Sequence, residues 1–307
     1  MNRVFNFNLH YKCGNYCRNC ISHNTKEYSS AFLSFDDIRN VFDIYAPDDG
    51  DIIIISGGEP SLYEDISSLL YYIRKRSACR IVAYSNGEGW GDTEKLEAAA
   101  SCLDRITLSC YGLVGEHIWQ SGNERSFENL YYAFTMFESQ RKSIDCSLSI
   151  EFKYVSTRHA PCRVEKILAS LEHSVQLDSI VLSRMLGEHG ELCSQSLWAE
   201  TMAENLKVLR KDSRWSHIPL KLVDIQPCLL GKELFAEIED ARPIRMDKEI
   251  LFFDGRNTNG KRLYFQKKAY FFPKCEICQL SSVCGTTATC YGALLWKKES
   301  GWSYADE

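Results

Sequence analysis

Three cysteines near the beginning of the chain have the type and spacing of metal ligands. Cys13, Cys17 and Cys20 lie in the sequence Cys-Gly-Asn-Tyr-Cys-Arg-Asn-Cys, directly after a short β-rich run. Three thiolates this close together can converge on one metal centre. A [4Fe–4S] cluster normally takes four cysteines, so three would leave one iron with an open coordination position. A zinc ion would instead need a fourth ligand, which His10 or His23 could supply, and the spacing alone fits both metals.

A second group of cysteines lies near the other end of the sequence, within residues 275–290. Four cysteines in so short a segment fit a structural zinc site, and they also fit an iron–sulfur cluster. Either metal would stabilise a segment that is short of apolar residues. Most of the dispersed cysteines are expected to pack as small buried hydrophobic residues. The candidate ligands in this second group are Cys275, Cys278, Cys284 and Cys290, with Cys228 as an alternative fourth ligand.

The composition is that of an ordinary globular protein. The chain has 307 residues, of which 45% are hydrophobic and 25% charged, and its formal net charge is −5. This charge gives no reason to expect nucleic acid as a partner. We expect no membrane association either, because no apolar run is long enough to span a bilayer and residues 1–14 lack the apolar stretch of a secretory signal. A cytoplasmic location follows, where the 14 cysteines stay reduced.

The elements that must position these cysteines follow a repeated strand–helix pattern. Short β-rich runs alternate with stretches whose apolar residues recur at helical spacing. Two of the helices begin with a capping-box pattern, Ser34 with Asp37 and Ser61 with Glu64. Six such units imply a parallel sheet with right-handed crossovers, and we predict an α/β fold, a partial (β/α)6 TIM-like barrel. The predicted strands span residues 4–10, 51–56, 80–85, 105–109, 146–155 and 179–184, and the helical patterns cover 38–45, 66–73, 96–103, 127–134, 164–171 and 196–210.

The pattern changes after about residue 213. From Trp215 onward the chain is rich in turns and ends with the second cysteine group. We therefore predict two domains: a barrel over residues 1–213 and a small metal-stabilised domain over residues 214–307. In the barrel, a functional site is expected at the carboxyl ends of the strands, which is where the first cysteine group lies.

The Cys-x3-Cys-x2-Cys spacing after the first strand resembles the defining motif of the radical S-adenosylmethionine (SAM) superfamily. The second strand ends in Gly57-Gly58-Glu59-Pro60, which is similar to the GGEP motif of that family. Two glycines allow close backbone approach, and Glu59 can accept a hydrogen bond from an ammonium group. In the family, a [4Fe–4S] cluster binds SAM at its open iron and cleaves it reductively to a 5′-deoxyadenosyl radical. This radical then removes a hydrogen atom from the substrate, and the resemblance implies the same cofactors and activity here.

The resemblance also implies which residues contact SAM. Ser85-Asn86-Gly87 closes the third strand as the family's (Thr/Ser)-Asn-Gly does, and Ser109 ends the fourth strand at a position that often contacts the ribose. The family usually has an aromatic residue just before the third cysteine, where this chain has Asn19, so Tyr16 is the candidate that compensates near adenine. The implied cofactor-binding residues are Tyr16, Asn19, Gly57, Gly58, Glu59, Pro60, Ser85, Asn86, Ser109 and Arg184, the last of which could contact SAM or a substrate carboxylate.

The C-terminal cysteines resemble the Cys-x2-Cys-x5-Cys core of the SPASM extension. That extension carries auxiliary [4Fe–4S] clusters in many radical SAM peptide maturases. Here Ala288 and Phe265 stand where the complete pattern has further cysteines. The resemblance therefore implies a truncated SPASM- or twitch-type domain with one auxiliary [4Fe–4S] cluster.

Enzymes with such auxiliary clusters mostly modify peptides. We expect a ribosomally synthesised precursor peptide as substrate, a crosslink, thioether, epimerised residue or oxidised side chain as product, and a flavodoxin or ferredoxin as electron donor. Because the sequence begins almost at its first strand, a leader peptide would be bound by a separate protein or by the C-terminal region. An epimerase would need a hydrogen-donating thiol, for which Cys110, Cys193 and Cys228 are candidates. The alternatives are a radical SAM dehydrogenase or mutase acting on a small molecule, and a non-catalytic zinc or iron–sulfur binding module.

Overall fold

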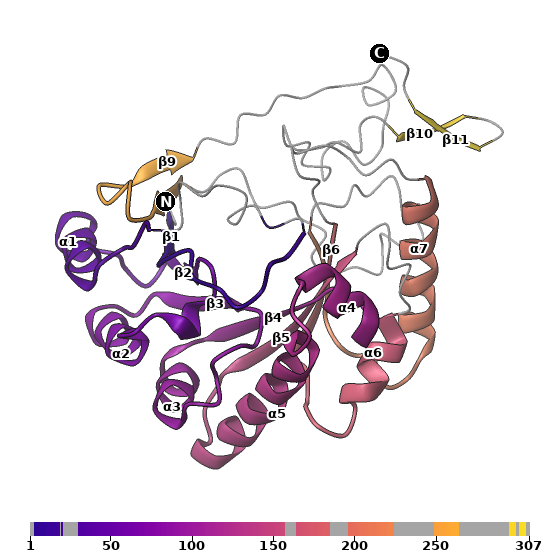
Figure 1. Cartoon of the computed structure of the whole chain (residues 1–307), viewed down its shortest axis with the longest axis horizontal. Coiled ribbons are helices and arrows are strands. Elements are labelled where there is room, and N and C mark those ends of the chain that lie inside the picture. Colours follow the sequence, from indigo (N-terminus) through magenta and orange to yellow (C-terminus); the bar gives the residue numbers. More distant parts are fainter. Residues whose placement is uncertain are drawn as a thin grey trace.

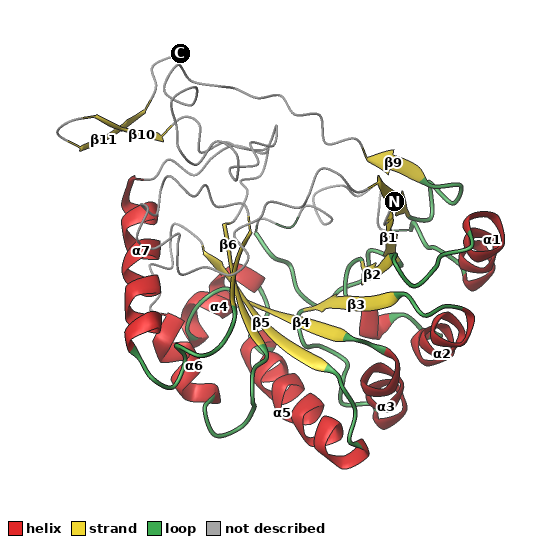
Figure 2. Ribbon diagram, turned by 180° about the vertical axis from the view of Figure 1, so that it is seen from behind, coloured by secondary structure: helices red, strands yellow, loops and turns green. Residues whose placement is uncertain are grey.

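The computed structural model describes residues 3–18, 20, 30–156, 164–184, 196–223, 249–263, 295–298 and 301–304. Within this part of the chain, the main sheet has nine strands in the order β7-β6-β5-β4-β3-β2-β1-β8-β9. Strands β1 to β8 pair in parallel, and β9 pairs antiparallel with β8. The sheet is curved, and most of the helices lie along its outer side (Figures 1 and 2). The predicted α/β fold, a partial TIM-like barrel, is confirmed.

All six predicted strands and all six predicted helices are present. The strands are β1 (Arg3–Asn8), β2 (Ile52–Ser56), β3 (Arg80–Ser85), β4 (Arg105–Cys110), β5 (Ser149–Ser156) and β6 (Ser179–Arg184). The helices are α1 (Phe35–Tyr45), α2 (Ile66–Arg76), α3 (Thr93–Cys102), α5 (Ser126–Ile144), α6 (Val164–Leu171) and α7 (Ser196–Lys211). A further short helix, α4 (Val114–Ser121), lies between β4 and α5 and has no counterpart among the predicted helices.

Alternating residues of each strand bury one face of the sheet against the helices. Phe5 and Phe7 of β1, Ile53 and Ile55 of β2, and Ile106 of β4 are completely buried in one hydrophobic core. Residues between them point to the inner face of the sheet, so strand alternation separates a packing face from a face that can line a site.

The two predicted capping boxes have different outcomes. The box that joins Ser34 and Asp37 caps α1 as expected. The box that joins Ser61 and Glu64 is wrong, because Ser61 lies inside a 3-10 turn, η2 (Pro60–Leu62), and α2 begins later, after Asp65. The Ser61 hydroxyl instead donates to the Glu88 carbonyl oxygen and is not available for capping.

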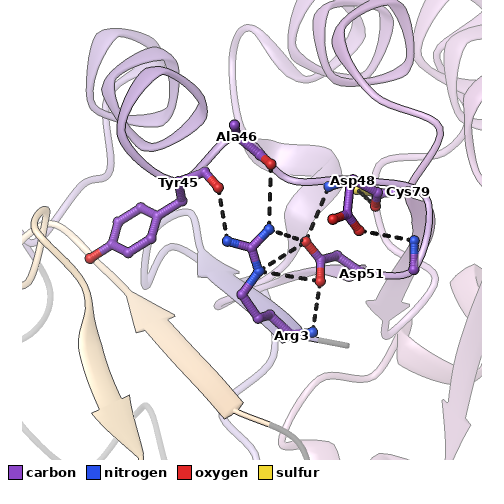
Figure 3. A network of polar contacts seen from close by, with 7 residues as sticks. Arg3, Tyr45, Ala46, Asp48, Asp51 and Cys79 are labelled. Atoms are coloured by element: carbon purple, nitrogen blue, oxygen red, sulfur yellow. Dashed lines mark hydrogen bonds and ion pairs between the residues drawn. The ribbon is translucent and has the colours of Figure 1, made fainter. Parts of the chain in front are cut away.

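An ion pair joins Arg3, at the beginning of β1, to Asp51, the residue before β2 (Figure 3). The Arg3 guanidinium lies 2.5 Å from the Asp51 carboxylate, whose side chain is only 1% exposed. The same guanidinium donates to the carbonyl oxygens of Tyr45 and Ala46 at the C-terminal end of α1. Burial alone would raise the pKa of Asp51, but hydrogen bonds from Arg3 and from the Asp48 amide lower it overall. Arg3, held in place by Asp51, therefore donates to carbonyl oxygens at the end of α1 that have no partner within the helix.

The sheet extends beyond the six predicted strands at both edges. Strand β7 (Leu220–Val223) pairs with β6, and β8 (Glu249–Phe253) pairs with β1, followed by β9 (Lys261–Leu263). These strands come from residues after 213, which the sequence assigns to the C-terminal domain. Strands β10 (Leu295–Lys298) and β11 (Gly301–Tyr304) form a separate antiparallel pair. The domain boundary at residues 213/214 stays a prediction, and none of the described helices is both long and apolar enough to cross a membrane.

Candidate functional site

The cysteine-bearing segment, residues 11–20, leaves the carboxyl end of β1 and is held first by the glycine turn after β2. The Gly58 amide donates to the His10 carbonyl oxygen at 2.6 Å, and the Glu59 amide donates to the Lys12 carbonyl oxygen at 2.9 Å. Only glycine fits this approach. A Cβ at Gly58 would lie 2.2 Å from the Lys12 oxygen, and Gly57 has a φ of +140° and would place its Cβ 2.5 Å from the His10 oxygen.

A second support comes from the turn after β3. The Gly14 amide donates to Glu88 Oε2 at 2.8 Å, and the Asn86 side-chain amide donates to Cys13 Sγ at 3.2 Å. The carboxyl ends of β1, β2 and β3 are neighbours in the sheet, so their turns converge on the same segment. This convergence explains how groups more than 70 residues from the cysteines contact them.

The third support is the C-terminal end of α4. The Tyr16 amide donates to the Ser121 carbonyl oxygen at 2.7 Å, and the Arg18 amide donates to the Gln120 carbonyl oxygen at 3.0 Å. These carbonyls belong to the last turn of the helix, where they have no partner within it. Asn123 adds a side-chain hydrogen bond to the Gly14 carbonyl oxygen at 3.2 Å. The cysteine segment is thus fixed on three sides.

Glu59 is directed toward β3. Its side chain is completely buried, and its carboxylate accepts hydrogen bonds from the Ser85 hydroxyl at 2.8 Å, the Asn86 amide at 2.7 Å and the Ser61 amide at 3.2 Å. Burial raises the pKa of Glu59 to about 7, against the lowering effect of these hydrogen bonds. The side chain therefore joins the turn after β2 to the end of β3.

Ser85 connects that turn to the core. Its hydroxyl, besides donating to Glu59, accepts hydrogen bonds from the Gly87 amide at 2.9 Å and the Trp90 indole at 2.8 Å. Trp90 is itself 1% exposed. Ser85 and Glu59 thus join the turn after β2 to the turn after β3, and their predicted contacts to SAM stay predictions.

The inner face of the sheet is polar. Ser109 of β4 lies there beside Lys153 of β5, its partner in the strand register. One layer below, Glu151 is 2% exposed and accepts from the Ser179 hydroxyl at 2.7 Å and the Lys221 ammonium at 2.5 Å. Buried groups of this kind are stable only when paired, and Glu151 is paired in this way with residues of β6 and β7.

Residues 7–139 match the sequence family described as the radical SAM superfamily. This part of the chain is a radical SAM domain. The matched residues contain the three cysteines, the glycine turn after β2 and the turn after β3. A comparison with curated protein sequences gives no match.

Solved structures with the same fold include proteins bound to peptides. The crystal structure of Streptococcus suis SuiB has a TM-score of 0.61 at 14% identity, covering 95% of this chain and 67% of that one. SuiB bound to precursor peptide SuiA gives 0.62 at 14% identity, covering 95% of this chain and 66% of that one. Native anSMEcpe with bound AdoMet and Cp18Cys peptide gives 0.60 at 14% identity, covering 93% and 88%. The chain spans about two thirds of SuiB, and at such identities the likeness shows the fold.

The radical SAM domain implies SAM and a [4Fe–4S] cluster, and its three cysteines fit that cluster by donor chemistry. All three thiols are half-buried on the segment at the edge of the barrel. Among the described residues, no three His, Cys, Asp or Glu side chains are arranged around one metal ion. A cluster does not require that arrangement, because each of its cysteines binds a different iron. Burial raises the pKa of Cys13 to about 12 and that of Cys17 to about 11, so ligation must displace their protons.

Among the described residues, His10 is not brought together with the cysteines around a single zinc ion. Its Nδ1 accepts a hydrogen bond from the Lys12 amide at 2.9 Å, and its ring stacks on Tyr63 with centroids 6.0 Å apart. Burial lowers the pKa of His10 to about 4. The imidazole is thus buried at the point where the cysteine segment leaves β1. The other candidate, His23, lies outside the described residues.

The remaining predicted site residues are distributed as follows. Tyr16 is 67% exposed, Pro60 is buried in η2, and Cys110 is buried in the core on the helix side of β4, away from the inner face that carries Ser109. Arg184 ends β6, and only its backbone is described. Outside the described residues lie Asn19, Cys193, Cys228, Cys275, Cys278, Cys284 and Cys290.

Sequence reasoning missed several residues that support the site. Glu88 and Asn123 hold the Gly14 backbone, and Tyr111 places its hydroxyl 3.9 Å from Cys17 Sγ. Lys153 lies on the inner face beside Ser109. Their position in the sequence was the available signal: Glu88 and Tyr111 follow the carboxyl ends of β3 and β4, and Lys153 alternates with the buried residues of β5.

Proposed function

We propose that the protein is a radical SAM enzyme that modifies a ribosomally synthesised peptide. The supporting observation is the cysteine segment, which is fixed against the glycine turn after β2 at the carboxyl edge of the barrel. When bound to Cys13, Cys17 and Cys20, a [4Fe–4S] cluster supplies the electron that cleaves SAM to methionine and a 5′-deoxyadenosyl radical, which abstracts a hydrogen atom from the substrate.

The chain's own residues hold and orient the reactants in this proposal. The Gly57-Gly58 turn lets the backbone after β2 approach the His10 and Lys12 carbonyls closely, and this approach holds the start of the cysteine segment in place. Ser109 and Lys153 lie on the inner face, where a hydroxyl and an ammonium can bind the ribose and a carboxylate. The other proposed SAM contacts are Tyr16, Asn19, Glu59, Pro60, Ser85, Asn86 and Arg184.

The peptide substrate is supported by the structural neighbours. SuiB is described with precursor peptide SuiA, and anSMEcpe with AdoMet and a peptide. Ser109 and Lys153, which are partners in the register of β4 and β5, present polar groups on the inner face and so suit a polar chain better than an apolar ligand. We extend the proposal to one auxiliary [4Fe–4S] cluster on Cys275, Cys278, Cys284 and either Cys290 or Cys228, and to a flavodoxin or ferredoxin as electron donor.

Anaerobic reconstitution tests the enzymatic part. The full chain, reconstituted with iron and sulfide and reduced with dithionite, should convert SAM to 5′-deoxyadenosine. Replacing Cys17 with Ala should abolish that product, whereas Cys79→Ala should retain it, because Cys79 is buried just before the amino end of β3 and the site lies at the carboxyl end. A colourless protein that retains zinc would support the binding-module alternative and contradict the proposal.

Coexpression tests the substrate class. Short peptides encoded next to the gene should lose hydrogen atoms, form a crosslink or thioether, or exchange an α-hydrogen when expressed with the enzyme, as mass spectrometry in deuterated solvent can detect. If 5′-deoxyadenosine forms but only a small molecule is modified, the enzyme is a dehydrogenase or mutase instead. No specific observation in the described residues favours that second function.

A further inference from the structure

Two of the three cysteine sulfurs have a neutral polar neighbour from another strand end. The Asn86 side-chain amide lies 3.2 Å from Cys13 Sγ, and Tyr111 Oη lies 3.9 Å from Cys17 Sγ. We propose that Asn86 and Tyr111 donate hydrogen bonds to the ligand sulfurs of the radical SAM cluster and thereby raise its reduction potential. The inference rests on the proposed function, because it requires a [4Fe–4S] cluster on these cysteines.

The orientation of the Asn86 amide is fixed by its other partners. Its Oδ1 accepts a hydrogen bond from the Glu88 amide at 2.8 Å, so the NH2 group must face Cys13. Its backbone amide donates to Glu59 Oε2 at 2.7 Å, and that carboxylate is completely buried. Asn86 is therefore held by Glu59 and Glu88, and its side-chain amide presents a donor to the Cys13 sulfur.

Tyr111 is fixed by the helix that follows it. Its backbone amide donates to His117 Nδ1 at 3.2 Å, and the two rings lie with centroids 5.4 Å apart. His117 is itself completely buried and packs against Phe127 at 5.6 Å. Two contacts to a buried residue hold the phenol ring in place. Its hydroxyl is thus kept beside Cys17.

Cluster binding decides the direction of these hydrogen bonds. A free thiol can donate to the Tyr111 oxygen, but a metal-bound thiolate has no proton and can only accept. The phenol must then be the donor toward Cys17, as the amide already is toward Cys13. Reduction adds negative charge to the cluster, and donors to its sulfurs stabilise the reduced form more than the oxidised form.

The experiment compares Tyr111→Phe with the wild-type full chain. Phenylalanine keeps the ring against His117 and removes only the hydroxyl. After anaerobic reconstitution without SAM, the midpoint potential is measured by electron paramagnetic resonance at controlled potentials. We expect the reduction equilibrium to shift about tenfold toward the oxidised cluster, which corresponds to about 59 mV for one electron.

Asn86→Ala is the second, independent variant, with an expected shift in the same direction. Tyr131→Phe is the matched control, because it removes the same atom from α5, where the hydroxyl contacts the Ser174 hydroxyl at 2.6 Å on the surface. Its potential should equal that of the wild type.

An unchanged potential at full iron content overturns the assignment for the residue concerned. Either variant suffices, so if one fails to assemble a cluster, the other decides. Failure of the proposed function has a different signature: the wild-type chain itself would then assemble no cluster or yield no 5′-deoxyadenosine. If the wild type cleaves SAM and neither variant shifts the potential, only the present inference fails.

Discussion

Gly58 has no room for a side chain, and this makes it a sensitive test of the site at the scale of single residues. In Gly58→Ala the new Cβ would lie 2.2 Å from the Lys12 carbonyl oxygen, and the backbone there cannot move without breaking the adjacent hydrogen bonds. We expect a loss of about 1–3 kcal/mol in the free energy of unfolding. We also expect the iron bound after reconstitution to fall by more than half. Urea unfolding and iron analysis measure both effects.

Gly115→Ala is the matched control for that variant. Gly115 lies in α4, which also supports the cysteine segment, but a Cβ there meets nothing within 4 Å. Alanine in a helix should leave iron binding unchanged and stabilise the fold by about 0.5–1 kcal/mol. Equal iron loss in both variants would contradict the close approach at Gly58 as the cause.

Single residues also show where sequence reasoning succeeds and where it stops. The cysteines and the glycine turn are recognisable because each is a local pattern with fixed spacing. Tyr111 and Glu88 are not, because they meet the cysteine segment through neighbouring strand ends, about 70 to 100 residues along the chain. Local spacing carries no information about such contacts. Only the general rule that sites lie at the carboxyl ends of parallel strands indicates them.

At the scale of elements, the Arg3–Asp51 pair should stabilise the junction between β1 and the start of β2, and it holds Arg3 where it also bonds the end of α1. Asp51→Asn removes the charge that pairs with Arg3, and because Arg3 is 23% exposed, we expect a moderate loss of about 2 kcal/mol at pH 7. The pKa of Asp51 is lower in the folded chain than in the unfolded chain. Its contribution is therefore present above the unfolded pKa of about 4 and is lost as the pH falls toward the folded value.

Urea unfolding of both proteins between pH 3 and pH 7 measures this effect. The difference between wild type and Asp51→Asn should be largest at pH 7 and should shrink below about pH 4. Asp36→Asn is the control, since Asp36 is 81% exposed in its pair with Arg39 and should cost less than about 0.5 kcal/mol. A difference between wild type and Asp51→Asn that does not change with pH would contradict the assignment.

The helices and strands could be predicted where one face is buried, because burial repeats apolar residues at a regular spacing along the sequence. One-sided packing gives helices and strands their spacing, so β1 to β6 and the helices after them follow from the sequence. The start of α2 was misjudged because Pro60 and Ser61 form a 3-10 turn, in which Ser61 contacts Glu88 instead of capping a helix. Helix α4 was missed because its eight residues show too few buried positions to define a period.

At the scale of the whole molecule, the sheet is completed by strands that lie far along the chain. Strand β8 pairs in parallel with β1, in the register Arg3 with Glu249. Its last residue, Phe253, is completely buried and lies 6.2 Å from the Phe5 ring and 5.3 Å from the Phe7 ring, measured between ring centroids. A run of five residues cannot indicate a partner about 246 residues away, so the sequence alone placed this strand outside the barrel.

This arrangement predicts that residues 1–213 do not fold as a stable unit. This fragment lacks β8, so β1 would become an exposed sheet edge and Phe5 and Phe7 would lose their contact with Phe253. Loss of one buried phenylalanine alone costs about 3–5 kcal/mol of the free energy of unfolding. We expect the 1–213 fragment to aggregate or unfold without a cooperative transition, as circular dichroism during heating would show. The 1–263 fragment, which retains β7, β8 and β9, should unfold cooperatively. If 1–213 melts cooperatively at the same temperature as 1–263, the strands after residue 213 are accessory to the barrel, because a core that needed Phe253 could not keep its stability without it.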